Sequence, residues 1–213
     1  MYNDILFDLD GTLTDSGRGI TNSVAYALDK YGISYKSKKE LECFIGPPLA
    51  LTFSSKFSLS KEEGEHLVSL YREYYSVKGI YQNDIYEGIP ALLEALKKKG
   101  KRLILATSKP EFYAKKILEH FKLARYFDDI CGATMTEERT KKDEVISYAL
   151  DRNGITELGS AVMIGDREYD ILGARAIGIN SIGVLFGYGS LEELKNAGAT
   201  HIAEKVEDIL KFI

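Results

Sequence analysis

ILFDLDGT, residues 5–12 of this chain, places a short apolar run directly before two carboxylates. The run, residues 5–7, is typical of a buried strand, and Asp8 and Asp10 follow it. Because residues two positions apart on a strand point the same way, we expect both carboxylates to face one substrate. One can act as a nucleophile while the other donates a proton, which indicates phosphate chemistry. The competing interpretation is an Asp-rich turn after a strand.

Two later apolar runs, residues 103–106 and 161–164, resemble the first run and also stop at a polar residue. Helical patterns lie between the runs, at residues 89–99 and 144–153. Strand and helix therefore alternate, which predicts an α/β fold: a three-layer, Rossmann-like core with a mostly parallel sheet. Ligands of such sheets bind beyond the carboxyl ends of the strands, so the polar residues after each run are expected to meet in one pocket.

Residues 15–83 contain helical patterns and no convincing strand. One of these patterns opens at Ser60-Lys61-Glu62-Glu63, which is a capping-box signature. We therefore expect an inserted all-helical cap domain over 15–83, and a core domain made of residues 1–14 and 84–213. The tyrosines of the insert, including Tyr71, Tyr74 and Tyr75, can stack a nucleobase, but their spacing is more typical of helix packing.

A second pair of carboxylates, Asp166 and Asp170, follows the run at 161–164. If a helix begins near Arg167, the two lie about one turn apart at its start. With Asp8 and Asp10 they would repel strongly in the absence of a cation, and hard oxygen ligands suit Mg²⁺. The alternative is that Asp166 caps the helix and Asp170 is solvated.

The remaining candidates bind anions. Thr107 and Ser108 end the second strand, and a helix opening at Pro110 makes an anion site from backbone N–H groups and a hydroxyl. Lys142 precedes another helix, where it can neutralise a phosphate and the nucleophile, although a lysine in this position is most often a surface residue. The candidates for binding the substrate are Gly11, Thr12, Ser108 and Lys109.

Composition restricts the classes of partner. The 213 residues carry 32 acidic and 28 basic side chains, a formal charge of −4, which shows no footprint for nucleic acid or an anionic membrane. No apolar run approaches the roughly 18 residues of a membrane span, and the chain starts without a basic segment, so we expect a cytoplasmic protein whose partner is a small phosphorylated metabolite. Cys43 and Cys131 are expected to be reduced thiols. The oligomeric state is not predicted.

Taken in order, DLDGT at residues 8–12, Thr107 with Ser108, Lys142, and Gly165-Asp166 with Asp170 resemble the four motifs of the haloacid dehalogenase superfamily. The resemblance covers essentially the whole chain. The helical insert is similar to the small cap of the phosphoglycolate phosphatase and 5′-nucleotidase branch. Residues 45–49 and 186–189 are similar to segments of that branch.

The resemblance implies a Mg²⁺-dependent phosphatase. Asp8 would attack phosphorus to form an aspartyl phosphate, and Asp10 would protonate the leaving oxygen and then activate water. Thr107 and Lys142 would hold the phosphoryl group. Asp8, the backbone carbonyl of Asp10 and Asp166 would bind Mg²⁺, with Asp170 bonded to a metal-bound water.

Other functions remain as alternatives. A phosphomutase of the β-phosphoglucomutase type shares the motifs and cap, but usually has Val at position 12 and an Arg-containing loop where residues 45–48 stand. A non-catalytic binding protein for a phosphorylated ligand should lack a nucleophile, acid or metal ligand, and none is missing here. Among phosphatase substrates, phosphoglycolate and nucleoside 5′-monophosphates come first, with pyrophosphate and sugar phosphates open.

Overall fold

Six parallel strands form the sheet of the first of two units into which the chain divides, Met1–Thr14 with Ile85–Ile213. The computed structural model describes residues 1–136 and 139–213. The sheet has the order β5-β4-β1-β6-β7-β8. Its strands are β1 (Asp4–Phe7), β4 (Arg102–Pro110), β5 (Asp129–Ala133), β6 (Ala161–Gly165), β7 (Asn180–Val184) and β8 (His201–Ala203).

The three apolar runs of the sequence form three neighbouring strands. Ile5 of β1 is paired with Leu103 of β4 on one side and with Val162 of β6 on the other, both in parallel. The carboxyl ends of β4, β1 and β6 therefore lie next to one another. The pattern of apolar residues does not predict strands β5, β7 and β8, because they are short or interrupted by polar residues and glycine.

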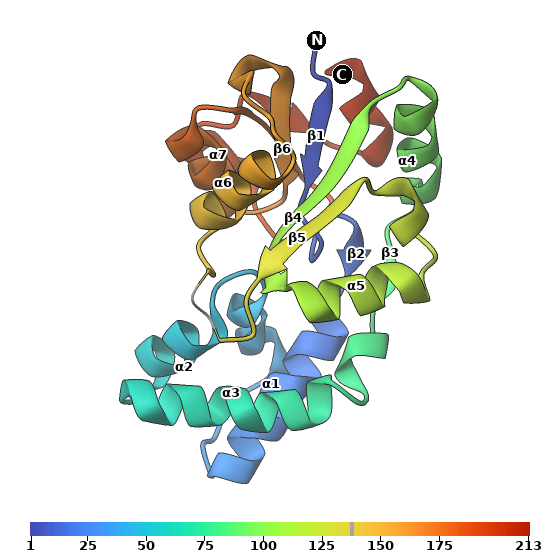
Figure 1. Ribbon diagram of the computed structural model, residues 1–213. Helices are drawn as coiled ribbons and strands as arrows, with labels where there is room; N and C mark the ends of the chain where they lie inside the picture. The colour runs from blue at the N-terminus through green and yellow to red at the C-terminus, as the bar shows by residue number, and fades with distance from the viewer. Residues whose placement is uncertain (137–138) are drawn as a thin grey trace. The chain divides into compact units, whose positions relative to one another are not determined.

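Helices cover the sheet in layers (Figure 1). In this unit they are α4 (Ile89–Lys98), α5 (Glu111–His120), α6 (Lys142–Arg152), α7 (Glu168–Ile177) and α8 (Leu191–Ala197), with 3₁₀ turns at Ala124–Tyr126, Leu158–Ser160 and Val206–Lys211. Apolar side chains of α6 and α7 pack with Leu6, Ile104 and Met163 of the sheet in one buried cluster. Helix α4 lies on the face of the sheet opposite to α6 and α7 (Figure 1). The three-layer α/β prediction is confirmed.

Two helix starts differ from the sequence expectation. Pro110 does not open a helix: β4 continues through a register shift after Thr107 as far as Pro110, and α5 begins at Glu111. Helix α6 begins at Lys142, two residues earlier than the predicted 144–153, because the Glu144 carboxylate accepts backbone N–H bonds from Thr140 and Lys141 just before the first turn. Lys142 is therefore the first helical residue.

The second unit, Asp15–Asp84, is helical. It contains α1 (Gly17–Tyr31), α2 (Leu49–Phe57) and α3 (Lys61–Tyr75), with 3₁₀ segments at Lys38–Phe44 and Gly79–Tyr81. The capping box predicted at Ser60 is present at the start of α3. Two short strands, β2 (Thr14–Asp15) and β3 (Asp84–Ile85), pair as a separate sheet. That this unit acts as a cap stays a prediction.

Tyr71 and Tyr75 of α3 are packing residues. Both are buried, and their rings stack with centroids 5.1 Å apart. The nucleobase-stacking interpretation therefore does not hold for these two side chains, because they have no exposed face to offer.

No helix among residues 1–136 and 139–213 combines the length and apolar character that a membrane span requires.

Candidate active site

The carboxyl ends of β1, β4 and β6 bring together the residues that follow the three apolar runs. Asp8 comes directly after β1, and its N–H donates to the Ile164 carbonyl of β6 at 2.9 Å. Thr107 lies within β4, and Asp166 comes directly after β6. The sheet order thus places chain segments more than fifty residues apart at one edge, as parallel strands require.

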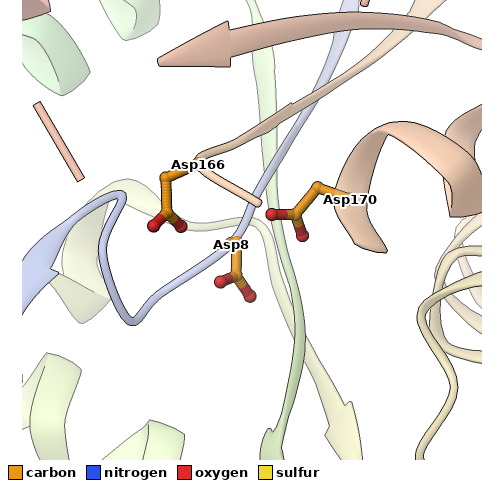
Figure 2. A group of neighbouring side chains, drawn as sticks. All are labelled: Asp8, Asp166 and Asp170. Atoms are coloured by element: carbon orange, nitrogen blue, oxygen red, sulfur yellow. The ribbon is translucent and has the colours of Figure 1, made fainter. Parts of the chain in front are cut away.

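Asp8, Asp166 and Asp170 form an acidic triad (Figure 2). Each offers a carboxylate oxygen, and these oxygens lie within 4.8 Å of one another. Asp170 comes from the first turn of α7 and is only 2% exposed. The alternative of a solvated Asp170 is therefore wrong. Asp166 does not cap α7 either, because Arg167 occupies the position before the helix.

Lys142 connects two members of the triad. Its Nζ donates to Asp8 Oδ1 at 2.6 Å and to the Ala106 carbonyl at 3.1 Å, and it lies 2.7 Å from Asp170 Oδ1. Burial favours loss of the proton, but Asp170 and Asp8 outweigh it and raise the pKa of Lys142 above its ordinary value. The lysine is thus a buried cation, and the surface alternative is wrong.

The carboxylates of the triad are held in an unfavourable environment. Burial raises the pKa of Asp8 to about 6, with Lys142 opposing the shift and Asp170 adding to it. Burial also raises the pKa of Asp166, and the charges of Asp170 and Asp8 reinforce that effect. Burial is the main cause of both shifts, and the nearby positive charge of Lys142 does not fully offset it for Asp8.

Asp10 has a different partner from Asp8. Its Oδ2 accepts a hydrogen bond from Lys109 Nζ at 2.6 Å, and its side chain is not part of the triad. The sequence placed Lys109 among the residues that bind the substrate, whereas the contact that the structure shows joins it to Asp10. The two carboxylates of the DLDGT segment are therefore each paired with a different buried lysine.

The other substrate-binding candidates lie around these groups. Thr12 Oγ1 donates to Asp166 Oδ1 at 3.2 Å, and the Gly11 N–H donates to the Thr14 carbonyl at 2.8 Å. Both contacts hold the loop and the triad in place. Thr107 is buried, and its Oγ1 accepts the Lys109 N–H at 3.2 Å. Ser108 beside it is half-buried.

A loop that the sequence analysis gave no role supports Asp166. The Tyr188 N–H donates to Asp166 Oδ2 at 2.8 Å, so both oxygens of this carboxylate accept hydrogen bonds. A Cβ at Gly187 would overlap Asp166 and the Gly11 carbonyl, and one at Gly189 would overlap the Asp166 carbonyl. The signals in the sequence are the pair of glycines around Tyr188 and the similarity of residues 186–189 to a segment of the phosphatase branch, and neither indicated a contact with Asp166.

Glycines also allow close packing next to Asp170 and Lys142. A Cβ at Gly165 would overlap the Asp170 carboxylate. A Cβ at Gly173 of α7 would lie 2.8 Å from Lys142 Cγ, which is too close for a real contact. Absence of a side chain at these two positions lets the triad and its lysine approach one another.

Comparison with known proteins identifies the family to which this chain is similar. The model of the haloacid dehalogenase-like hydrolases matches residues 5–184. A 5′-nucleotidase of Pseudomonas aeruginosa is 44% identical over 94% of this chain and 90% of its own. The tyrosine-protein kinase PtkA of Mycobacterium tuberculosis is 38% identical over 92% of this chain, which spans 66% of that protein.

Solved structures support the same grouping. A protein of Clostridium acetobutylicum, described as a predicted phosphatase, has a TM-score of 0.97 and 47% identity, covering 100% of this chain and 98% of its own. Fold, acidic triad and relatives agree with the resemblance found in the sequence. The chain belongs to the haloacid dehalogenase-like hydrolases and is a phosphatase of that family.

Proposed function

We propose that the chain hydrolyses a small phosphate monoester, with Mg²⁺ as cofactor and an aspartyl phosphate on Asp8 as intermediate. The observation that carries the proposal is the pairing of Asp8 and Asp10 with different partners. Asp8 lies in the acidic triad beside Lys142, and Asp10 lies outside the triad beside Lys109. Two carboxylates in different environments suit two different roles.

A divalent cation fits the charges and donors of the site. Asp8, Asp10, Asp166 and Asp170 bring four negative charges, and Lys109 and Lys142 bring two positive charges, so two negative charges remain if all six are ionised. Carboxylate oxygens are hard ligands of the kind Mg²⁺ prefers. Asp8 and Asp166, with the backbone carbonyl of Asp10, would hold the ion, and Asp170 would bond to its water. When bound, the ion supplies positive charge for the phosphoryl oxygens.

The residues of the chain divide the reaction into two steps. In the first, an Asp8 oxygen attacks phosphorus as the bond to the leaving oxygen breaks, and Asp10 gives that oxygen its proton. In the second, Asp10 takes a proton from water as the water oxygen attacks phosphorus. The bond between phosphorus and Asp8 breaks, which returns the Asp8 carboxylate and releases inorganic phosphate. Lys142 and Thr107 stabilise the charge on the transferring group.

A nucleoside 5′-monophosphate is the substrate class we favour, ahead of phosphoglycolate. The support is the identity of 44% with a relative named 5′-nucleotidase over nearly the full length of both chains.

The test is phosphate release from nucleoside 5′-monophosphates, phosphoglycolate, pyrophosphate and sugar phosphates, with Mg²⁺ and with EDTA. We expect Mg²⁺-dependent release that is greatest with nucleoside monophosphates. Inorganic phosphate is released only when water accepts the phosphoryl group. Its release therefore measures hydrolysis and not the kinase activity for which the mycobacterial relative is named. No release from any ester would contradict the proposal and favour a mutase or a binding role.

Binding of Mg²⁺ should weaken as the pH falls. The pKa of Asp8 is raised to about 6, so protons compete with the metal below that pH. We expect the apparent dissociation constant to be about tenfold larger at pH 5 than at pH 7, from one such group. Titration calorimetry at the two pH values measures it, and equal affinities would contradict the combination of a raised pKa and metal binding at Asp8.

The same shift predicts the stability of the metal-free protein. A carboxyl whose folded-state pKa is raised contributes stability that is complete below its unfolded pKa and is lost as pH rises through about 6. The contribution of Asp8 should therefore make the denaturant concentration needed for unfolding in EDTA lower at pH 7 than at pH 5. Asp8→Asn should flatten this part of the profile.

Gly187→Ala should weaken Mg²⁺ binding. The added methyl group overlaps Asp166, so either this carboxylate or the loop around Tyr188 must move. Changes in the groups that orient a metal ligand typically cost about 10- to 100-fold in affinity. Gly159→Ala is the control, since a Cβ there meets open space. Unchanged affinity in the Gly187 variant would exclude the loop from orienting Asp166.

A further inference from the structure

Lys109 distinguishes the two oxygens of Asp10. Its Nζ lies 2.6 Å from Asp10 Oδ2, and the two side chains are only 6% and 10% exposed. Asp10 Oδ1 is also buried, yet it has no hydrogen-bond partner among residues 1–136 and 139–213. A buried carboxylate oxygen without a partner is costly, and such a group calls for an explanation.

The backbone of Lys109 is anchored as well as its ammonium. The Lys109 N–H donates to Thr107 Oγ1 at 3.2 Å, at the register shift where β4 departs from regular pairing with β5. This irregular end of the strand carries the lysine at the same edge of the sheet as Asp10. The side chain and the main chain of Lys109 are thus both held by groups at the site.

We infer that Lys109 is a positioning residue for Asp10: it holds Oδ2 and leaves Oδ1 as the oxygen that transfers the proton. The inference rests on the proposed function. In the first step the P–O bond to the leaving group breaks, its electron pair takes the proton from Oδ1, and a bond forms between Asp8 and phosphorus. Negative charge then develops on Asp10, and the Lys109 ammonium stabilises it.

The competing role is direct binding of the phosphate by Lys109. A phosphate-binding lysine affects every ester alike, because the phosphoryl group is common to all. A lysine that acts through Asp10 matters most for esters whose leaving oxygen needs a proton. The dependence of the rate on the leaving group therefore separates the two roles. The quantity to compare is kcat/KM, because it depends only on the steps up to and including the first irreversible one.

The experiment compares Lys109→Met, Lys109→Arg and Lys101→Met on p-nitrophenyl phosphate and glycerol 3-phosphate. Lys101 is a matched control, since it is also buried, donates to the Tyr2 carbonyl at 2.6 Å and precedes the other end of β4. We expect Lys109→Met to lower kcat/KM about 100-fold for the alkyl ester and less than about fivefold for the aryl ester. Lys109→Arg should recover most of the loss, and Lys101→Met should leave both values unchanged.

A double variant keeps the test decisive if Lys109→Met folds poorly. Asp10→Asn removes the charge that Lys109→Met leaves buried, so Asp10→Asn/Lys109→Met should fold and should be no slower on the alkyl ester than Asp10→Asn alone. Equal losses on both esters in Lys109→Met, or a further loss in the double variant, would overturn the inference. Failure of the unmodified protein to release phosphate from these two esters and from every ester of the substrate panel would instead refute the proposed function.

Discussion

Asp8→Asn is expected to lower kcat by on the order of 10⁴-fold or more, because it removes the nucleophile of the proposed reaction. The amide keeps the shape of the carboxylate but cannot form the aspartyl phosphate. Asp8 is buried with its pKa raised to about 6, so its charge is not needed for the fold. We therefore expect the variant to unfold at the same temperature as the parent protein or a higher one.

The measurement is phosphate release together with thermal unfolding followed by circular dichroism. Asp151→Asn, an exposed position on α6, is the matched control and should leave both unchanged. Mass spectrometry must show that the new asparagine has not deamidated, since traces of Asp8 would restore turnover. Substantial activity in the intact variant would refute covalent catalysis by Asp8.

Lys142→Met is expected to cost both stability and activity. The ammonium contacts Asp8 at 2.6 Å and Asp170 at 2.7 Å, and all three side chains are at most 10% exposed. Removing one partner of a buried ion pair leaves uncompensated charge and typically costs about 3–5 kcal/mol. Loss of the charge next to the nucleophile should also lower kcat by on the order of 100-fold or more.

Denaturant unfolding in EDTA measures the first effect and phosphate release the second. Lys141→Met is the control, because this neighbouring lysine is exposed and its capping contact is made by the backbone. In an Asp8→Asn background the same substitution should destabilise less, since one of the two carboxylates has lost its charge. Equal costs in both backgrounds would show that Lys142 does not stabilise Asp8.

The local sequence was informative about the elements that carry the site. The apolar runs at residues 5–7, 103–106 and 161–164 became β1, β4 and β6, because continuous apolar segments are stable only inside a sheet covered on both faces. The polar residues after them lie at one edge because the three strands run parallel. Short strands such as β8, with only three residues, carry too little pattern to be found in this way.

The local sequence was less informative about side-chain partners. The sequence placed Lys142 next to the nucleophile, but it gave no signal that Lys109 pairs with Asp10 or that Lys142 also contacts Asp170. One pairs with Asp10 and the other with Asp8 and Asp170, through contacts between residues far apart in the chain. The contact of the Tyr188 N–H with Asp166 was missed because a backbone donor has no residue signature.

The sequence by itself therefore determined the fold class, the family resemblance and the carboxylates of the site, since these depend on apolar periodicity and on motifs that end strands. Only the tertiary structure decided that Lys109 pairs with Asp10, that Lys142 also contacts Asp170, and which loop holds Asp166. The physical reason is that a buried charge takes the partner that packing brings within hydrogen-bond distance, and packing depends on the whole sheet and its helices.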